Sequence, residues 1–173
     1  CNGSFSLGSH VFHDWKKGGH GTLNLRQGIA NSCNIYFYNT ALKTGIEEIA
    51  RVARELGLGA TPGIGLGDEA KGVIPSAEAR ARGGGEWYPG NTVMAGIGQG
   101  MVTVTPMQLV VMVSAIANGG TIFRPWVVRR VETLDRETIE EYGPTNEKFG
   151  VYLKSLFGVR DPVIPALSSR PPI

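Results

Sequence analysis

The sequence predicts an α/β (mixed α+β) domain that is mostly helical and contains a few strands. Two observations support this prediction. Three apolar segments with helical spacing each follow a helix-start signal, and a segment rich in β-branched residues follows the last of them. The chain has 173 residues, 42% of them hydrophobic and 18% charged, which is typical of a globular domain with a real core.

The first helical segment begins after Asn24. Asn24 is a favourable N-cap residue, and Gln27, three residues later, completes a capping-box pattern. Apolar residues recur as far as Tyr38, but residues 31–34 interrupt them with short polar side chains that favour turns. We therefore expect a helix, a short break and a second helix, with Ser32 at the bend between the two.

A third helix is expected to begin at Thr44, where Glu47 completes a second capping box. Apolar residues then fall on one face and charged residues on the other, and Gly57 ends the helix. This places Lys43-Thr44-Gly45 at the start of a helix. K-T-G also lines the substrate-binding strand of serine β-lactamases and penicillin-binding proteins, but the period-two alternation of a strand is absent here. We interpret this triplet as a look-alike.

Residues 58–92 are rich in turn residues and predict irregular structure. A further helix-start signal follows, in which Thr105 is the N-cap, Pro106 the first helical residue and Gln108 the partner in a capping box. The helix that they begin runs to about residue 118. It is apolar nearly all round, which predicts that it is buried on every side.

The last third of the chain predicts little regular structure. From residue 121 the sequence predicts a strand broken by Pro125, followed by a strand of β-branched residues over 126–132. From Gly143 onward the pattern weakens, although Phe149 and the apolar residues up to Phe157 suggest a short helix. The Pro-rich end of the chain predicts irregular structure.

Composition excludes several classes of protein. The net charge of +2 and the scattered basic residues give no sign of a nucleic-acid partner. The sequence contains no run of about 18 apolar residues, so it predicts no membrane span. The opening Cys1-Asn2-Gly3 leads us to expect a chain cut from something longer. Two cysteines, Cys1 and Cys33, are too few for a disulfide framework, although a single disulfide between them is possible.

Three histidines, His10, His13 and His20, raise the alternative of an unrelated metal protein. A full set of acidic or cysteine partners at helical spacing from them is missing, so we favour loop or capping roles and predict neither a metal nor a cofactor. Metal analysis of the purified chain would test this alternative.

The strongest candidate for chemistry is Ser32-Cys33-Asn34, an S-x-N triplet. By itself it is weak evidence, because average composition gives roughly even odds of one in a chain of this length. A polar turn that interrupts a helix explains it equally well. Its sequence context favours a functional role.

That context consists of three stretches in order: "HGTLNLRQGIANSCNIYFYNTA", "LGLGATPGIGLGDEAKGVIPS" and "WYPGNTVMAGIGQGMVTVTPMQLVVMVSAIANGGTIFRPWVVRRV". With the Cys1-Asn2-Gly3 opening they resemble the transpeptidase domain of class B penicillin-binding proteins, most closely the penicillin-binding protein 2 group that serves cell elongation. The resemblance covers roughly residues 1–142. It implies a partial transpeptidase domain of the penicillin-binding-protein and serine β-lactamase fold in residues 1–142, followed by a divergent tail in residues 143–173.

The resemblance also implies a function. Enzymes of this family cross-link peptidoglycan: a serine in an S-x-x-K motif attacks the D-Ala-D-Ala amide of a stem peptide, and β-lactams acylate the same serine. Ser32 then matches the catalytic serine of S-x-N, which relays a proton. Asn34 matches the asparagine, which is both catalytic and substrate-binding. The expected partners are stem peptides, β-lactams and proteins of the cell-elongation machinery, at the periplasmic face of the bacterial inner membrane.

Two of the family's three catalytic elements have no counterpart here. No serine is followed by a lysine three residues on, and residues 144–173 do not look like the region that carries the true K-T-G. We therefore expect a fragment of a D,D-transpeptidase that is inactive alone and exposes apolar surface. The alternative is a non-catalytic interaction module on the same scaffold.

Overall fold

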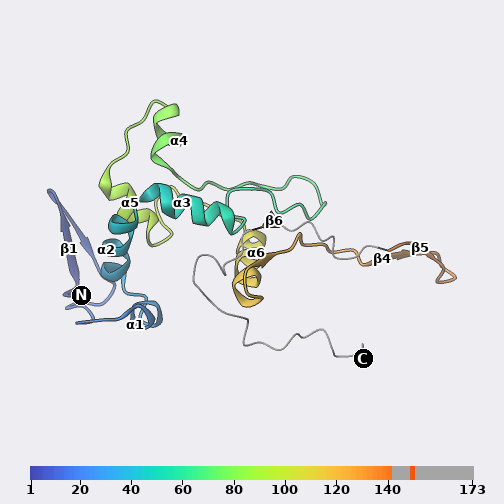
Figure 1. The fold of residues 1–173 in the computed structure, drawn as a ribbon, viewed down its shortest axis with the longest axis horizontal. Coiled ribbons are helices and arrows are strands. Elements are labelled where there is room, and N and C mark those ends of the chain that lie inside the picture. The colour runs from blue at the N-terminus through green and yellow to red at the C-terminus, as the bar shows by residue number, and fades with distance from the viewer. Residues whose placement is uncertain (142–148, 151–173) are drawn as a thin grey trace. The chain divides into compact units, whose positions relative to one another are not determined.

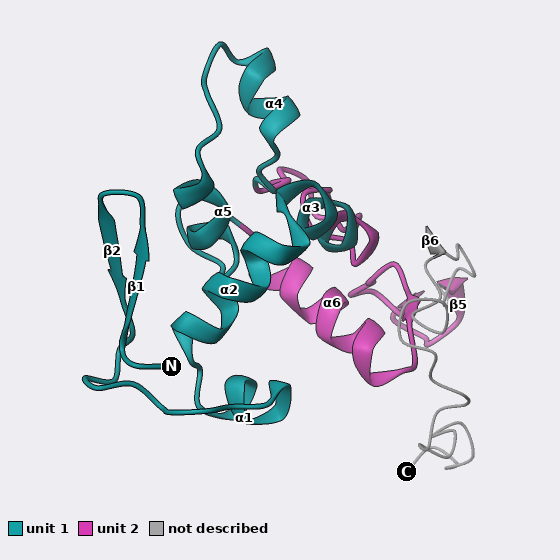
Figure 2. Ribbon diagram, turned by 60° about the vertical axis from the view of Figure 1, so that its left-hand side comes forward, with its two compact units in different colours: residues 1–53, 73–103 teal, residues 54–72, 104–173 magenta. Residues whose placement is uncertain are grey.

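The computed structural model describes residues 1–141 and 149–150. The chain divides into two compact units, each made of two segments (Figure 2). Unit 1 contains residues 1–53 and 73–103, and unit 2 contains residues 54–72 and 104–173. Figure 1 shows the order of the helices and strands along the chain.

Unit 1 begins with a hairpin that the sequence did not predict. Strand β1 (Ser4–Leu7) pairs with the antiparallel strand β2 (His10–His13), so that Leu7 lies opposite His10 across a tight turn. Alternate residues of β1 are shielded from solvent, as expected for a strand with one covered face. The rings of Phe5 and Phe12 lie 5.9 and 5.6 Å from that of Tyr38, which anchors the hairpin to the helical part of the unit.

The helix–break–helix prediction is confirmed. Helix α1 (Leu25–Ala30) has the predicted capping box, in which Asn24 and Gln27 each bond the other's backbone amide. Helix α2 (Asn34–Thr44) follows after a three-residue turn and buries Ile35, Tyr38 and Ala41. Ile35 and Tyr38 join Cys33 and Val93 in the core of unit 1.

Helix α2 packs closely against helix α5 (Pro89–Ala95). The two backbones come close together at Gly96, just after α5, where an added Cβ would lie 2.3 Å from the Cβ of Ala41. Real Cβ atoms do not come that close, so glycine is required here for steric reasons and not for its backbone conformation (φ −62°). The contact fixes α2, and with it the turn that precedes α2.

Helix α3 (Ile46–Glu55) is amphipathic as predicted, with Ile46 and Ala50 buried. The predicted capping box at Thr44 is wrong. Thr44 is the last residue of α2 and only Gly45 separates the two helices, so Thr44 has no room to act as an N-cap. The Glu47 carboxylate instead accepts hydrogen bonds from the backbone amides of Ala77 (2.8 Å) and Glu78 (3.4 Å).

The prediction of irregular structure for residues 58–92 is wrong in part, because this region contains helix α4 (Ala77–Arg82) and the start of α5. Ser76 caps α4 through a bond from the amide of Ala79, and Pro89 occupies the first turn of α5. Both are helix-start signals that the abundance of glycine nearby obscured.

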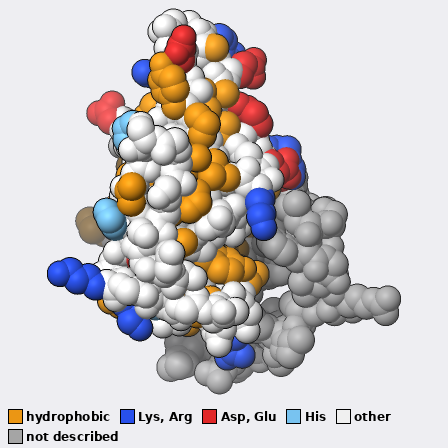
Figure 3. Space-filling view, turned by 90° about the vertical axis from the view of Figure 1, so that its left-hand side faces the viewer, with side chains coloured by type: hydrophobic (Ala, Val, Ile, Leu, Met, Phe, Trp, Pro, Cys, Tyr) orange, Lys and Arg blue, Asp and Glu red, His pale blue; other side chains and the backbone are white. Residues whose placement is uncertain are grey.

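An apolar surface lies on the hairpin side of unit 1. Leu7 and Phe12 of the hairpin and Pro89 and Met94 of α5 line a hollow there. Figure 3 faces this side and shows hydrophobic side chains grouped in a band.

Unit 2 is organised around helix α6 (Pro106–Ala117), which starts with the predicted capping box. Gln108 is fully buried, and its Nε2 donates to the carbonyl oxygens of Ala60 (2.7 Å) and Lys71 (2.8 Å). The side-chain amide therefore ties the loop between α3 and α4 to the first turn of α6.

The prediction that α6 is buried on every side is wrong. Val111 and Ala115 are buried and form a small core with Ile122, but the opposite face is open to solvent. Val110, Val113 and Ile116 are each 57% exposed. The described residues cover one face of a helix that is apolar all round, which agrees with the expectation that the chain exposes apolar surface.

The strands of unit 2 are short. Strand β3 (Thr121–Ile122) pairs with β6 (Phe149–Gly150), and β4 (Arg130–Glu132) pairs with β5 (Thr138–Glu141), both antiparallel. The strands predicted over residues 121–132 are thus confirmed only at the two ends of that range.

The short helix suggested from Phe149 is wrong for Phe149–Gly150, which is a strand, and its remaining residues lie outside the described part. None of the described helices is long and apolar enough to cross a membrane.

Candidate functional site

The S-x-N triplet forms the turn between α1 and α2, as predicted. Ser32 is exposed and adopts φ +48°, the left-handed region that L-residues enter only at a cost. The turn is closed by bonds from the Ser32 amide to the Ile29 carbonyl and from the Cys33 amide to the Gly28 carbonyl, both 3.0 Å. Cys33 is buried and Asn34 begins α2. The serine therefore stands at a fixed, solvent-facing bend.

Asp14 and Trp15 hold this turn from the preceding segment. The Oδ2 atom of Asp14 accepts bonds from the Cys33 thiol and the Ile35 amide, both 3.3 Å. The indole Nε1 of Trp15 donates to the carbonyl oxygens of Asn31 and Ser32, both 3.1 Å. Two consecutive residues thus bond the turn on either side of its strained position.

Asp14 is also the centre of a cluster of metal-ligating side chains with Cys1, His20 and Cys33. One potential ligand atom from each lies within 4.8 Å of all the others. Oδ1 of Asp14 lies 3.5 Å from Nδ1 of His20, and the Cys1 thiol lies 3.4 Å from Oδ2 of Asp14. Two sulfurs, one imidazole nitrogen and one carboxylate oxygen are a donor set that suits a tetrahedral Zn²⁺ ion.

Burial and hydrogen bonding set the protonation of this cluster. Burial alone would raise the pKa of Asp14, but bonds from the Lys16 and Ile35 amides and the Cys33 thiol, together with the charge of His20, lower it. Burial raises the pKa of the Cys33 thiol. Nε2 of His20 is buried and has no hydrogen-bond partner among the described residues.

The sequence did not reveal this cluster. The sequence-based prediction considered ligands at helical spacing around the histidines, whereas these four residues come from separate segments that only the fold brings together. His10 and His13 lie on β2, outside the cluster. Both cysteines are free thiols, so the bridge that the sequence left open is not formed here.

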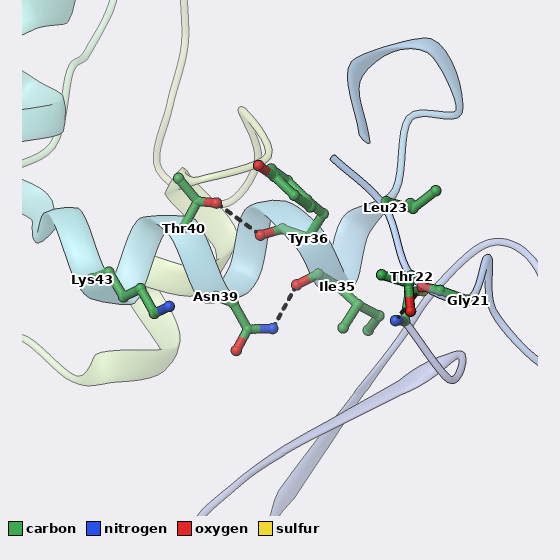
Figure 4. A pocket seen from close by; sticks show the side chains of 9 residues that line it. Gly21, Thr22, Leu23, Ile35, Tyr36, Asn39, Thr40 and Lys43 are labelled. Atoms are coloured by element: carbon green, nitrogen blue, oxygen red, sulfur yellow. Dashed lines mark hydrogen bonds between the residues drawn. The ribbon is translucent and has the colours of Figure 1, made fainter. Parts of the chain in front are cut away.

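The prediction that the Lys43-Thr44-Gly45 triplet does not lie on a strand is confirmed. Lys43 lies in the last turn of α2, beside a shallow pocket that Figure 4 shows from close by. Two other polar side chains there bond the backbone of their own helix: Asn39 donates to the Ile35 carbonyl (2.7 Å) and Thr40 to the Tyr36 carbonyl (3.0 Å). The triplet thus has the geometry of a helix end and not of a substrate-binding strand.

Comparison with known proteins identifies the family of the chain. The sequence model described as "Penicillin binding protein transpeptidase domain" matches residues 2–151. The chain belongs to this family. The transpeptidase resemblance and the fold class predicted from the sequence are therefore confirmed. The boundary at residue 142 and the roles of Ser32 and Asn34 stay predictions.

Curated relatives of the chain include peptidoglycan D,D-transpeptidases named MrdA. The chain is 39% identical to MrdA of Acinetobacter baumannii over 122 residues, which are 70% of this chain and 18% of the relative. It is 36% identical to MrdA of Escherichia coli K12 over 115 residues, which are 66% of this chain and 18% of the relative. The chain thus spans about a fifth of the length of these relatives.

Solved structures agree. The chain resembles penicillin-binding protein 2 (PBP2) of Helicobacter pylori in its complex with MreC, with a TM-score of 0.68 and 35% identity over 72% of this chain and 23% of that one. It also resembles PBP2 of Pseudomonas aeruginosa in complex with WCK 5153, with a TM-score of 0.70 and 30% identity over 84% of this chain and 33% of that one.

Proposed function

We propose that this chain supplies the S-x-N turn of a peptidoglycan D,D-transpeptidase of the PBP2 type. The whole reaction is the cross-linking of stem peptides through a serine acyl-enzyme, with β-lactams acylating the same serine. The observation that carries the proposal is the exposed Ser32 at a fixed left-handed bend, within a segment that matches the transpeptidase family.

In this proposal Ser32 acts as a proton relay. A serine nucleophile needs a nearby base, and in this family the base is a lysine kept neutral by its surroundings. A hydroxyl group can accept and donate a proton at once, so the Ser32 hydroxyl passes the proton between that lysine and the leaving amine. The Asn34 side-chain amide, two residues on, binds the substrate backbone.

The 173-residue chain alone does not perform the reaction, because its sequence contains no S-x-x-K and its K-T-G lies on a helix end. A fluorescent β-lactam tests this directly. The full-length protein that carries this segment should be labelled, whereas the 173-residue chain should not. Covalent labelling of the 173-residue chain would contradict the claim that the chain lacks the serine nucleophile of S-x-x-K.

The role of Ser32 has its own test in the full-length protein. Ser32→Ala should slow acylation by about 100-fold, the lower end of what general acid–base groups contribute. Ser9→Ala, in the turn of the hairpin, is a matched control that should leave the acylation rate unchanged. An unchanged rate in Ser32→Ala would refute the relay.

Partners and location follow from the same proposal. The Helicobacter pylori PBP2 structure contains MreC, so we propose proteins of the elongation machinery as partners of the full-length protein, at the periplasmic face of the inner membrane. The runner-up is a non-catalytic interaction module on the same scaffold. Failure of the full-length protein to react with β-lactam would favour that module.

A further inference from the structure

We propose that Trp15 is a positioning residue that holds Ser32 in the conformation needed for proton relay. This inference rests on the proposed function of Ser32. The inference depends on one hydrogen-bond donor, the indole N–H of Trp15. This N–H is shared between the carbonyl oxygens of Asn31 and Ser32, on either side of the strained Ser32 backbone.

The bend needs such support. Ser32 adopts φ +48°, and a non-glycine residue persists in the left-handed region only where its surroundings over-determine it. The two backbone bonds that close the turn use the amides of Ser32 and Cys33. They leave the carbonyls of Asn31 and Ser32, which the indole of Trp15 binds at 3.1 Å each.

Core packing does not explain Trp15. Its side chain is 65% exposed, an unusual position for the largest apolar residue type. Its ring lies 5.3 Å from that of His20, tilted by 60°, and its N–H is directed at the turn, where it donates to the carbonyls of Asn31 and Ser32. The preceding residue, Asp14, is buried and binds the other side of the turn. Hydrogen bonding to the turn is therefore the main contribution of Trp15.

The consequence concerns the direction of the Ser32 hydroxyl. Without the indole donor, both carbonyls turn to water and the backbone at Ser32 is free to relax toward φ below zero. That rotation moves the hydroxyl away from the proton path while leaving the rest of the site in place. A displacement of about 1 Å in a reacting group is enough for a large loss of rate.

Trp15→Phe is the variant that tests this, because it keeps an aromatic ring beside His20 and removes the N–H donor. In the full-length protein we expect the limiting acylation rate by a β-lactam to fall about 10-fold, with the dissociation constant of the initial complex unchanged. Trp126→Phe, at a 42% exposed tryptophan in unit 2, is the control for losing an indole and should leave both constants unchanged.

A double-mutant cycle separates positioning from general destabilisation. If Trp15 acts through Ser32, Trp15→Phe should have no further effect on the rate once Ser32 is alanine. Independent, multiplicative effects of the two substitutions would overturn the inference. So would a fall in affinity with an unchanged limiting rate.

The outcomes also separate the two proposals. If Ser32→Ala does not slow acylation, the proposed function fails and the inference fails with it. If Ser32→Ala slows acylation but Trp15→Phe does not, only the inference fails. Hydrogen exchange of the unmodified 173-residue chain gives a measurement that needs no variant: the indole N–H of Trp15 should exchange more slowly than that of Trp126, and equal rates would overturn the inference.

Discussion

Gln108 offers the sharpest test of how unit 2 is held together, because the chain contains a matched control for it. Gln108 and Gln27 both occupy the third position of a capping box and bond the amide of their N-cap residue. Only Gln108 also binds elsewhere, at the carbonyls of Ala60 and Lys71, with no part of its side chain exposed. Gln27 is exposed. Substitution of each by alanine therefore separates the capping bond from the buried bonds.

The expected magnitudes follow from these contacts. Gln27→Ala should cost no more than about 1 kcal/mol, the scale of one capping interaction. Gln108→Ala loses the same bond and also deprives two carbonyls of their donor, at about 1 kcal/mol each, and leaves a cavity. The capping bond and the two carbonyls sum to about 3 kcal/mol, and the cavity adds to this, so the total loss should exceed about 3 kcal/mol.

Urea unfolding of the 173-residue chain, with amide exchange of residues 60–72 as the local readout, measures both variants. Gln108→Ala should lower the midpoint more and deprotect the loop, whereas Gln27→Ala should leave the loop unchanged. Equal losses in the two variants would refute the claim that the buried bonds to the loop matter.

Three further predictions concern other sites. Gly96→Ala should destabilise the chain by about 1–3 kcal/mol or more, because its Cβ would overlap that of Ala41, whereas Gly83→Ala, whose Cβ would meet nothing closer than 3.4 Å, should have little effect on the melting temperature. The sequence led us to predict no metal, but the cluster of Cys1, Asp14, His20 and Cys33 reverses that expectation, and the chain should bind one Zn²⁺ per molecule by elemental analysis. Cys33→Ser should lose the zinc and His10→Gln should keep it, and wild-type protein without zinc would contradict a zinc site at this cluster. Burial would raise the pKa of Glu69, but the amides of Gly65, Gly63 and Ile64 and the charge of Arg124 lower it. The stability that Glu69 contributes is thus present above its ordinary pKa and lost as the pH falls through the lowered one, so Glu69→Gln should remove the acid-dependent loss of protection at the Gly63 amide (2.6 Å from Glu69).

The features that the sequence predicted well are local. The capping boxes at Asn24–Gln27 and Thr105–Gln108 formed because each side chain reaches an amide only three residues away. The bend at Ser32 follows from polar residues that are adjacent in sequence. In each case the interactions that decide the structure lie within one turn of the chain.

The prediction failed where a distant group replaced the local one. Thr44 and Glu47 have the same spacing as the two successful capping boxes, yet the Glu47 carboxylate binds the N-terminal amides of α4, thirty residues away. The hairpin of β1 and β2 was missed because two four-residue strands give too short an alternation, and its packing against Tyr38 is not visible in sequence.

Helix α2 shows how this non-local capping connects the site to the metal-ligating cluster. Its N-cap residue, Cys33, makes no side-chain capping bond, and the amide of Ile35 is bound instead by Asp14. A carboxylate is favourable there because it lies near the positive end of the helix dipole. The same carboxylate joins the cluster that contains Cys1, His20 and Cys33. Asp14 therefore caps the helix that carries Asn34 and also belongs to the cluster of metal-ligating side chains. A shift of its carboxylate would disturb both sets of contacts. Because Cys33 directly follows Ser32, any change in the ligands of this cluster reaches the S-x-N turn through a single peptide bond, which makes the cluster part of the support of the candidate active site and not a separate structural feature.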